Sequence, residues 1–150
     1  METVRSKDGT AIAFDRLGKG PPLVLVGGSF EHRALESETA KLAVFPLLGE
    51  HFTLFHYDRR GRGDSTNTPP YAVRREVDDL GAVIDAAGGA AFVSGISSGA
   101  ALSLLGAAEL GQKTTPFVMP DARKRALENQ TYEVSPEALG PVLVEFFGSN

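Results

Sequence analysis

A serine between two glycines, in Gly95-Ile96-Ser97-Ser98-Gly99, is the stretch of this sequence best suited to chemistry. A short apolar run (residues 91–93) precedes it, and a run of small residues that favours a helix follows it. Between a strand and a helix, such a turn holds the serine hydroxyl above the end of the sheet, where the first amides of the helix also point. The sharp turn leaves no room for side chains at either flank, which glycine satisfies. The pattern predicts that Ser97 is a nucleophile and that the amide of Ser98 can stabilise an anion, although an ordinary glycine- and serine-rich loop is the alternative.

A second loop of the same kind follows the apolar run at residues 23–26. This run is continuous, which is typical of a strand covered on both faces of a sheet, and it ends in Gly27-Gly28-Ser29-Phe30. Glycines after a strand let backbone amides approach an anion closely. We therefore expect this segment to lie near the carboxyl end of the sheet with its amides available.

A serine hydroxyl needs a base at neutral pH, and the chain has three histidines. His56 lies within a predicted strand and is expected to pack in the sheet. His51 ends a predicted helix, away from Ser97. His32 follows the glycine loop and is the histidine placed nearest the predicted site, where the alternative is a solvated loop histidine.

Acidic and basic residues cluster after the predicted strand at residues 52–57, in Asp58-Arg59-Arg60-Gly61-Arg62-Gly63-Asp64. Asp58 and Asp64 could act as catalytic acids, but loop aspartates more often hold a turn through hydrogen bonds to the backbone. The three arginines could bind a carboxylate or a phosphate. Pairing with neighbouring acids is the alternative, and the loop lacks the spacing of a phosphate-binding motif.

Composition restricts the class of protein. The chain has 150 residues, of which 42% are hydrophobic and 23% charged, and we expect a single domain over residues 1–150. A net charge of -4 argues against nucleic acid or an anionic membrane as the partner, and the absence of cysteine excludes disulfides and thiolate metal sites. We expect no metal and no cofactor.

The uncharged residues 86–108 are numerous enough to span a bilayer, but glycines and serines interrupt them, and a buried strand followed by a buried helix explains them better. The N-terminus does not resemble a signal peptide. The expected location is the cytoplasm.

Strands and helices alternate along the chain, which predicts an α/β fold whose sheet is mostly parallel after an antiparallel hairpin. Asp8-Gly9 joins the two strands of that hairpin. Predicted strands cover residues 3–6, 11–16, 23–26, 52–57 and 91–94, with weaker ones at 115–119 and 123–127. Predicted helices cover residues 38–50, where Pro46 implies a kink or a late start, and residues 71–87, 98–110 and 135–147.

Together, the hairpin, the glycine loop, the segment Tyr57-Asp58-Arg59-Arg60-Gly61-Arg62-Gly63-Asp64-Ser65 and the serine turn resemble the α/β-hydrolase family, in the family's order. The resemblance covers about residues 1–110, and residues 122–147 resemble the family's last strand, histidine loop and closing helix. It implies helices on both faces of the sheet and hydrolysis of an ester or lactone. Ser97 would be the nucleophile, and the amides of Ser98 and Ser29, with Gly28 behind the latter, would bind the oxyanion.

The sequence departs from the family pattern in two ways that bear on activity. The chain is shorter than the family norm, so that the lid and the strand that bears the catalytic acid are expected to be missing. In addition, Tyr132 stands where the pattern has its histidine, and a phenol with a pKa of about 10 is a poor base at pH 7.

Three hypotheses follow. In the first, the chain is a weak or non-standard esterase or lactonase. In the second, it binds a small molecule without hydrolysing it, and a variant of this hypothesis is a cyclisation or isomerisation in which Tyr132 donates a proton. The third is a non-catalytic assembly module. Because missing strands leave sheet edges and apolar surface uncovered, we also expect a homo-oligomer.

Overall fold

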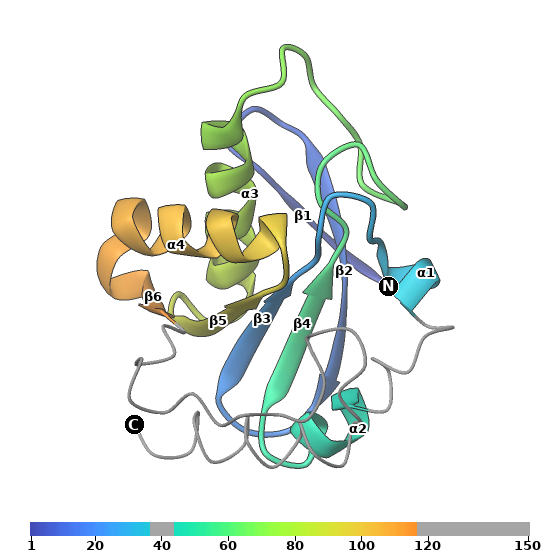
Figure 1. Ribbon diagram of the computed structural model, residues 1–150, viewed down its shortest axis with the longest axis vertical. Coiled ribbons are helices and arrows are strands. Elements are labelled where there is room, and N and C mark those ends of the chain that lie inside the picture. Colours follow the sequence, from blue (N-terminus) through green and yellow to red (C-terminus); the bar gives the residue numbers. More distant parts are fainter. Residues whose placement is uncertain (37–43, 117–150) are drawn as a thin grey trace.

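The computed structural model describes residues 1–36 and 44–116, in which strands and helices alternate (Figure 1). The strands are β1 (Glu2–Arg5), β2 (Ala11–Gly18), β3 (Pro22–Val26), β4 (Thr53–Tyr57), β5 (Ala91–Gly95) and β6 (Thr114–Pro116). The helices are α1 (Arg33–Glu36), α2 (Val44–Gly49), α3 (Val73–Ala86) and α4 (Ser98–Leu110), and a 3-10 turn, η2 (Gly111–Lys113), follows α4.

The six strands form one sheet in the order β1-β2-β4-β3-β5-β6. The pairs β1–β2 and β2–β4 are antiparallel, whereas β3 pairs in parallel with both β4 and β5, and β5 with β6. The predicted α/β fold, with a mostly parallel sheet after an antiparallel hairpin, is therefore confirmed. Because β3 and β5 are parallel neighbours, the loops that follow them leave the sheet at the same edge.

The hairpin turn forms as its Asp-Gly pair predicts. The Ser6 amide donates to the Thr10 carbonyl at 2.9 Å, and Gly9 has a φ of 85°. The Asp8 carboxylate accepts from the Thr10 amide at 3.0 Å. A glycine is needed at this turn because an L side chain rarely adopts a positive φ.

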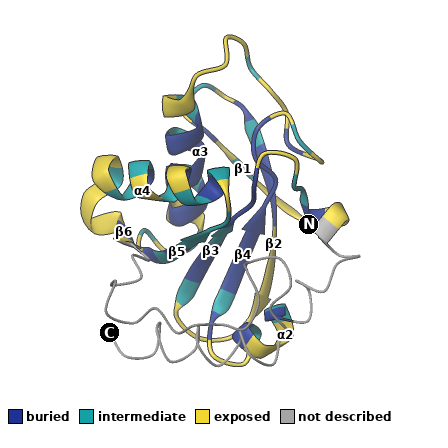
Figure 2. Cartoon of the chain, in the orientation of Figure 1, coloured by how far each residue is buried: buried dark blue, intermediate teal, exposed yellow. Residues whose placement is uncertain are grey.

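Helices cover both faces of the sheet, and most of β3 is buried between them (Figure 2). Val24 and Val26 belong to a core formed with α3 and α4, whereas Leu23 belongs to a second core with Val44 and Leu48 of α2. Successive residues of a strand point to opposite faces, so a continuous apolar run fills two cores at once. This arrangement fixes β3 in the middle of the molecule.

The structure differs from the predicted helices at α2 and at α1. Of the helix predicted over residues 38–50, the described part is α2, which begins at Val44. Pro46 therefore lies in the first helical turn, where its missing N–H breaks no intrahelical bond. The short helix α1 was not predicted, since four residues carry too little periodicity.

Near the end of the described chain, β6 corresponds to the start of the strand predicted at residues 115–119. The strand predicted at residues 123–127 and the helix predicted at residues 135–147 lie outside the described residues. Within the uncharged residues 86–108 lie β5 and most of α4, so the prediction of a strand followed by a helix is confirmed. The strand is buried or half-buried as expected, but α4 buries only Gly99, Leu102 and Gly106 and exposes Leu104, so the prediction of a buried helix is wrong for its outer face. No helix in the described ranges is long and apolar enough to cross a membrane.

Candidate active site

Ser97 occupies the turn between β5 and α4, with a φ of 52° and a ψ of -122°. Within residues 1–36 and 44–116, it is the one residue other than glycine with a positive φ. Such a conformation costs about 1–3 kcal/mol, and the surrounding packing must impose it. The side chain of Ser97 is exposed, so its hydroxyl is open to an incoming molecule.

The two glycines that flank Ser97 are required by close backbone packing. A β-carbon on Gly95 would lie 2.3 Å from the carbonyl oxygen of Gly99. A β-carbon on Gly99 would lie 2.2 Å from the carbonyl oxygen of Val26, at the end of β3. The amide of Ile96 also donates to that carbonyl at 3.1 Å. These contacts press the turn against the loop that follows β3 and hold Ser97 in its strained conformation.

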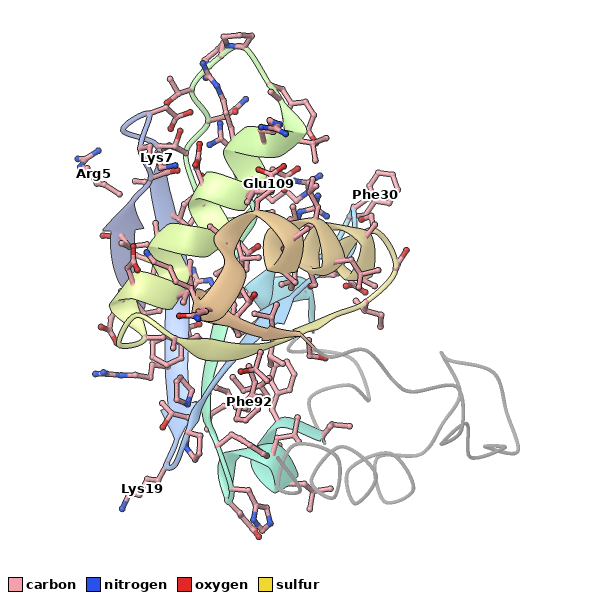
Figure 3. The ribbon with its side chains drawn as sticks, turned by 90° about the vertical axis from the view of Figure 1, so that its left-hand side faces the viewer. Arg5, Lys7, Lys19, Phe30, Phe92 and Glu109 are labelled. Carbon is pink, nitrogen blue, oxygen red and sulfur yellow. The ribbon has the colours of Figure 1, made fainter. Side chains whose placement is uncertain are left out.

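The glycine loop (residues 27–30) lies beside Ser97. A β-carbon on Gly28 would lie 3.6 Å from the β-carbon of Ser97, and the hydroxyl of Ser29 donates to that of Ser98 at 2.8 Å. In the part of the chain that the structure describes, no acceptor receives the amide hydrogen of Ser29 or of Ser98. The structure thus brings together the four residues Gly28, Ser29, Ser97 and Ser98. Phe30, which ends the loop, is 90% exposed and projects from the surface (Figure 3).

Glu31 is a neighbour of this site that sequence reasoning missed. Its Oε2 atom accepts from the Gly28 amide at 2.6 Å. The same oxygen lies 3.2 Å from the position of a β-carbon on Gly28, which Ser97 also borders. A negative charge therefore lies close to the nucleophile. The only available signal was the position of an acid three residues after a glycine.

Arg59 is a buried side chain that bonds to both the serine turn and the glycine loop. Its guanidinium donates to the hydroxyl of Ser98 at 3.0 Å and to the carbonyl oxygen of Gly27 at 3.3 Å. It also makes two bonds to the carboxylate of Glu76 on α3, Nε to Oε2 at 2.5 Å and Nη2 to Oε1 at 2.9 Å. The Tyr71 hydroxyl donates to Oε1 of Glu76 at 2.8 Å. A buried arginine–glutamate pair therefore supports the serine turn and the glycine loop together.

The charges of this pair are stabilised by their mutual contacts. Burial opposes the ionisation of Glu76, but the hydrogen bonds from Arg59 and Tyr71 outweigh it, so the pKa of Glu76 lies below its ordinary value. Burial likewise opposes the charge of Arg59, yet the contact with Glu76 raises the pKa of the guanidinium. The bond to Glu76 is the main cause that raises the pKa of Tyr71. The network therefore stays a charged pair with a neutral phenol at neutral pH.

Asp58 holds the loop after β4 through hydrogen bonds to the backbone, as the turn-holding interpretation predicts, whereas the Asp64 carboxylate pairs with an arginine side chain. The carboxylate of Asp58 accepts from the amides of Arg33 at 2.7 Å and Asp64 at 2.8 Å. The Asp64 carboxylate accepts from the Arg33 guanidinium at 2.6 Å. A β-carbon on Gly63 would clash with the Asp58 carboxylate, which accounts for the glycine. Neither aspartate has a recorded contact with Ser97.

The three arginines of this loop do not behave alike. Arg59 pairs with Glu76, and Arg60 makes two bonds of 2.7 Å to Asp79 and one of 2.9 Å to Asp8. Arg62 instead donates to two carbonyl oxygens, those of Ser29 at 2.6 Å and Arg60 at 3.2 Å. Pairing with acids therefore holds for two of the three.

The histidines are separated from one another. His56 is buried on β4, with its ring 5.2 Å from that of Phe45 in an edge-on contact, as expected for a core histidine. His51 is exposed after α2. His32 is half-buried between the glycine loop and α1, and its Nδ1 atom has no hydrogen-bond partner among the described residues.

Two further features considered in the sequence are the role of Tyr132 and a bound metal. Tyr132 lies outside the described residues. In residues 1–36 and 44–116, no cluster of histidine and acidic side chains could hold a metal ion.

Comparison with known proteins gives one family match and many structural ones. The model of the alpha/beta hydrolase family matches residues 23–147. An alpha/beta hydrolase from Sphaerobacter thermophilus is 60% identical with a TM-score of 0.69, over 76% of this chain and 42% of that one. The bottromycin epimerase BotH, solved with bottromycin A2, is 29% identical with a TM-score of 0.66, over 79% and 48%.

A thermophilic esterase from Thermogutta terrifontis, solved with malate bound, is 25% identical with a TM-score of 0.64, over 75% of this chain and 42% of that one. The chain thus spans less than half the length of these solved structures. The search of curated proteins finds no match.

Proposed function

The chain belongs to the alpha/beta hydrolase family, and from this premise we propose that it hydrolyses a carboxylic ester or lactone with Ser97 as the nucleophile. The observation that carries the proposal is the strained, exposed turn at Ser97, next to the Ser29 and Ser98 amides, which have no acceptor among the described residues. A backbone strain of this kind persists only where the structure over-determines it, and such sites are often functional. The resemblance to an esterase supports the choice of an acyl substrate.

In the proposed reaction, Oγ of Ser97 attacks the carbonyl carbon of the ester and passes its proton to a base. The carbonyl oxygen becomes an oxyanion that accepts from the amides of Ser29 and Ser98, and one such donor stabilises the transition state by about 3 kcal/mol. The intermediate then expels the alcohol, which takes up the proton, and leaves an acyl-serine. Water repeats the sequence, releases the acid and restores the hydroxyl of Ser97.

Arg59 would act as a positioning residue for this oxyanion site. Arg59 donates to the hydroxyl of Ser98 and to the carbonyl oxygen of Gly27. Because the hydroxyl of Ser29 also donates to that of Ser98, hydrogen bonds link the two residues whose amides are the proposed donors. Donors fixed before the reaction need not reorganise as charge develops.

His32 remains the proposed base, with Tyr132 as a proton donor if the chemistry is not hydrolytic. The half-buried ring of His32 lies next in the chain to Glu31, whose carboxylate borders the site. A histidine has an ordinary pKa near neutrality and can take the proton of Ser97 if its ring reaches the hydroxyl. A small-molecule substrate and self-association of the chain are further parts of the proposal.

The test is labelling with a fluorophosphonate, which reacts with activated serines, followed by mass spectrometry of the modified peptide. We expect a single adduct at Ser97, its loss in Ser97→Ala, and slower labelling in His32→Gln. Ser103→Ala is the matched control, because this serine lies on α4 and bonds to the Gly99 carbonyl. Labelling that appears only after Tyr132→His would contradict hydrolysis by the chain as it stands and would favour binding or non-hydrolytic chemistry.

A further inference from the structure

We propose that Arg62 binds a carboxylate on the substrate, so that the site prefers esters with an anionic group a few bonds from the scissile carbonyl. This inference rests on the proposed role of Ser97. It concerns the class of substrate, which neither the family match nor the catalytic residues specify.

The first observation is that Arg62 differs from the neighbouring arginines in its partners. Carboxylates neutralise Arg33, Arg59 and Arg60 at distances between 2.5 and 3.1 Å. Arg62 contacts only the carbonyl oxygens of Ser29 and Arg60, and none of the described residues brings a carboxylate within ion-pairing distance of it. A guanidinium has five N–H donors in a fork that matches a carboxylate, so donors remain for one more partner.

The second observation is the place of this guanidinium. Its Nε atom donates to the carbonyl of Ser29 at 2.6 Å, and the amide of Ser29 is one of the two proposed oxyanion donors. The hydroxyl of the same residue bonds to Ser98 at the start of α4. The Arg62 guanidinium is therefore hydrogen-bonded to Ser29, the residue whose amide would bind the carbonyl oxygen of the substrate. Arg62 is also half-buried, and a half-buried charge is screened by salt less than an exposed one.

The surrounding charges favour a single negative charge on the ligand. The charges of Arg59 and Glu76 cancel each other. The positive charge of Arg62 is one of the causes that lower the pKa of Glu76. The carboxylate of Glu31, on the Gly28 amide, is the negative charge that a bound anion would face across the loop. A carboxylate with one charge meets less repulsion there than a phosphate dianion would.

The experiment compares two esters of similar size, 4-nitrophenyl hydrogen succinate and the neutral 4-nitrophenyl butyrate. Arg62→Gln keeps a donor for the Ser29 carbonyl and removes the charge. We expect it to lower kcat/KM for the succinate ester by about tenfold or more, because a charged hydrogen bond is lost, and to change the butyrate value less than about twofold. For Arg62→Lys, the kcat/KM for the succinate ester should lie between the values of the wild type and of Arg62→Gln. Arg74→Gln is the matched control, since Arg74 is exposed on α3 and pairs with Glu109.

The result that overturns the proposal is an equal loss for both esters, which would mean that Arg62 only holds the glycine loop, or no selective loss at all. If the wild-type chain turns over neither ester, the proposed hydrolysis fails, and binding decides the inference independently. Saturation-transfer NMR of Ser97→Ala with monomethyl succinate and methyl butyrate should then show preferential binding of the anion, which Arg62→Gln abolishes. Absence of that preference would reject the anion site.

Discussion

Replacing Ser97 with glycine should stabilise the fold while removing its nucleophile. The residue is held at a φ of 52° and a ψ of -122°, where an L side chain is strained but glycine is not. The side chain is exposed, and the structure records no hydrogen bond from its hydroxyl to a described residue. The substitution therefore removes strain without removing a contact of the described chain.

The magnitude follows from two opposing effects. Release of the strained conformation contributes about 1–3 kcal/mol to the free energy of unfolding. The greater freedom of glycine in the unfolded chain offsets about 0.5–1 kcal/mol of this gain. The net expectation is a stabilisation of about 1 kcal/mol, or about 3 °C in Tm for a chain of this length.

Urea unfolding followed by circular dichroism measures this difference, with Ser97→Ala as the matched control. Alanine also removes the hydroxyl but keeps the strain, so its stability should stay within about 0.5 kcal/mol of the wild type. If glycine is no more stable than alanine at this position, then the backbone is not strained as described. In that case the surroundings of the turn would not impose its conformation.

Two further predictions concern the packing and the charges beneath the site. Gly99→Ala should destabilise the fold by about 3 kcal/mol, because its β-carbon meets backbone carbonyls of residues 26 and 27 at 2.2 and 2.6 Å. By contrast, Gly81→Ala in α3 meets only the flexible Leu110 side chain at 3.3 Å and should be neutral or slightly stabilising, and equal effects in urea melts would refute this packing. Because the fold lowers the pKa of Glu76, its contribution to stability is complete above the unfolded value of about 4.3 and is lost as the pH falls through the lower folded value. Acid titration should therefore show less loss of stability between pH 5 and 3 in Glu76→Gln than in the wild type, measured relative to each protein's value at pH 7, and parallel curves would contradict the linkage.

The features determined by the sequence alone are local. The hairpin at Asp8-Gly9 and the bounds of α4 at Ser98–Leu110 follow from backbone conformations that a few consecutive residues prescribe. The continuous apolar run in β3 also predicted a strand covered on both faces. Successive side chains of a strand point to opposite faces of the sheet, so an unbroken apolar run needs a core on each face. Such signals survive in the sequence because they depend on neighbours along the chain.

The features that only the tertiary structure decided are pairings between distant segments. The arginines at positions 59, 60 and 62 look alike in sequence, yet two are neutralised by acids of α3, 17 and 19 residues further along, and the third is left with carbonyl oxygens. Whether an arginine finds a carboxylate depends on which loops meet at the edge of the sheet, and a local pattern does not contain this information. The same holds for Glu31, whose carboxylate on the Gly28 amide becomes part of the site only because the turn at Ser97, after β5, packs against the loop after β3.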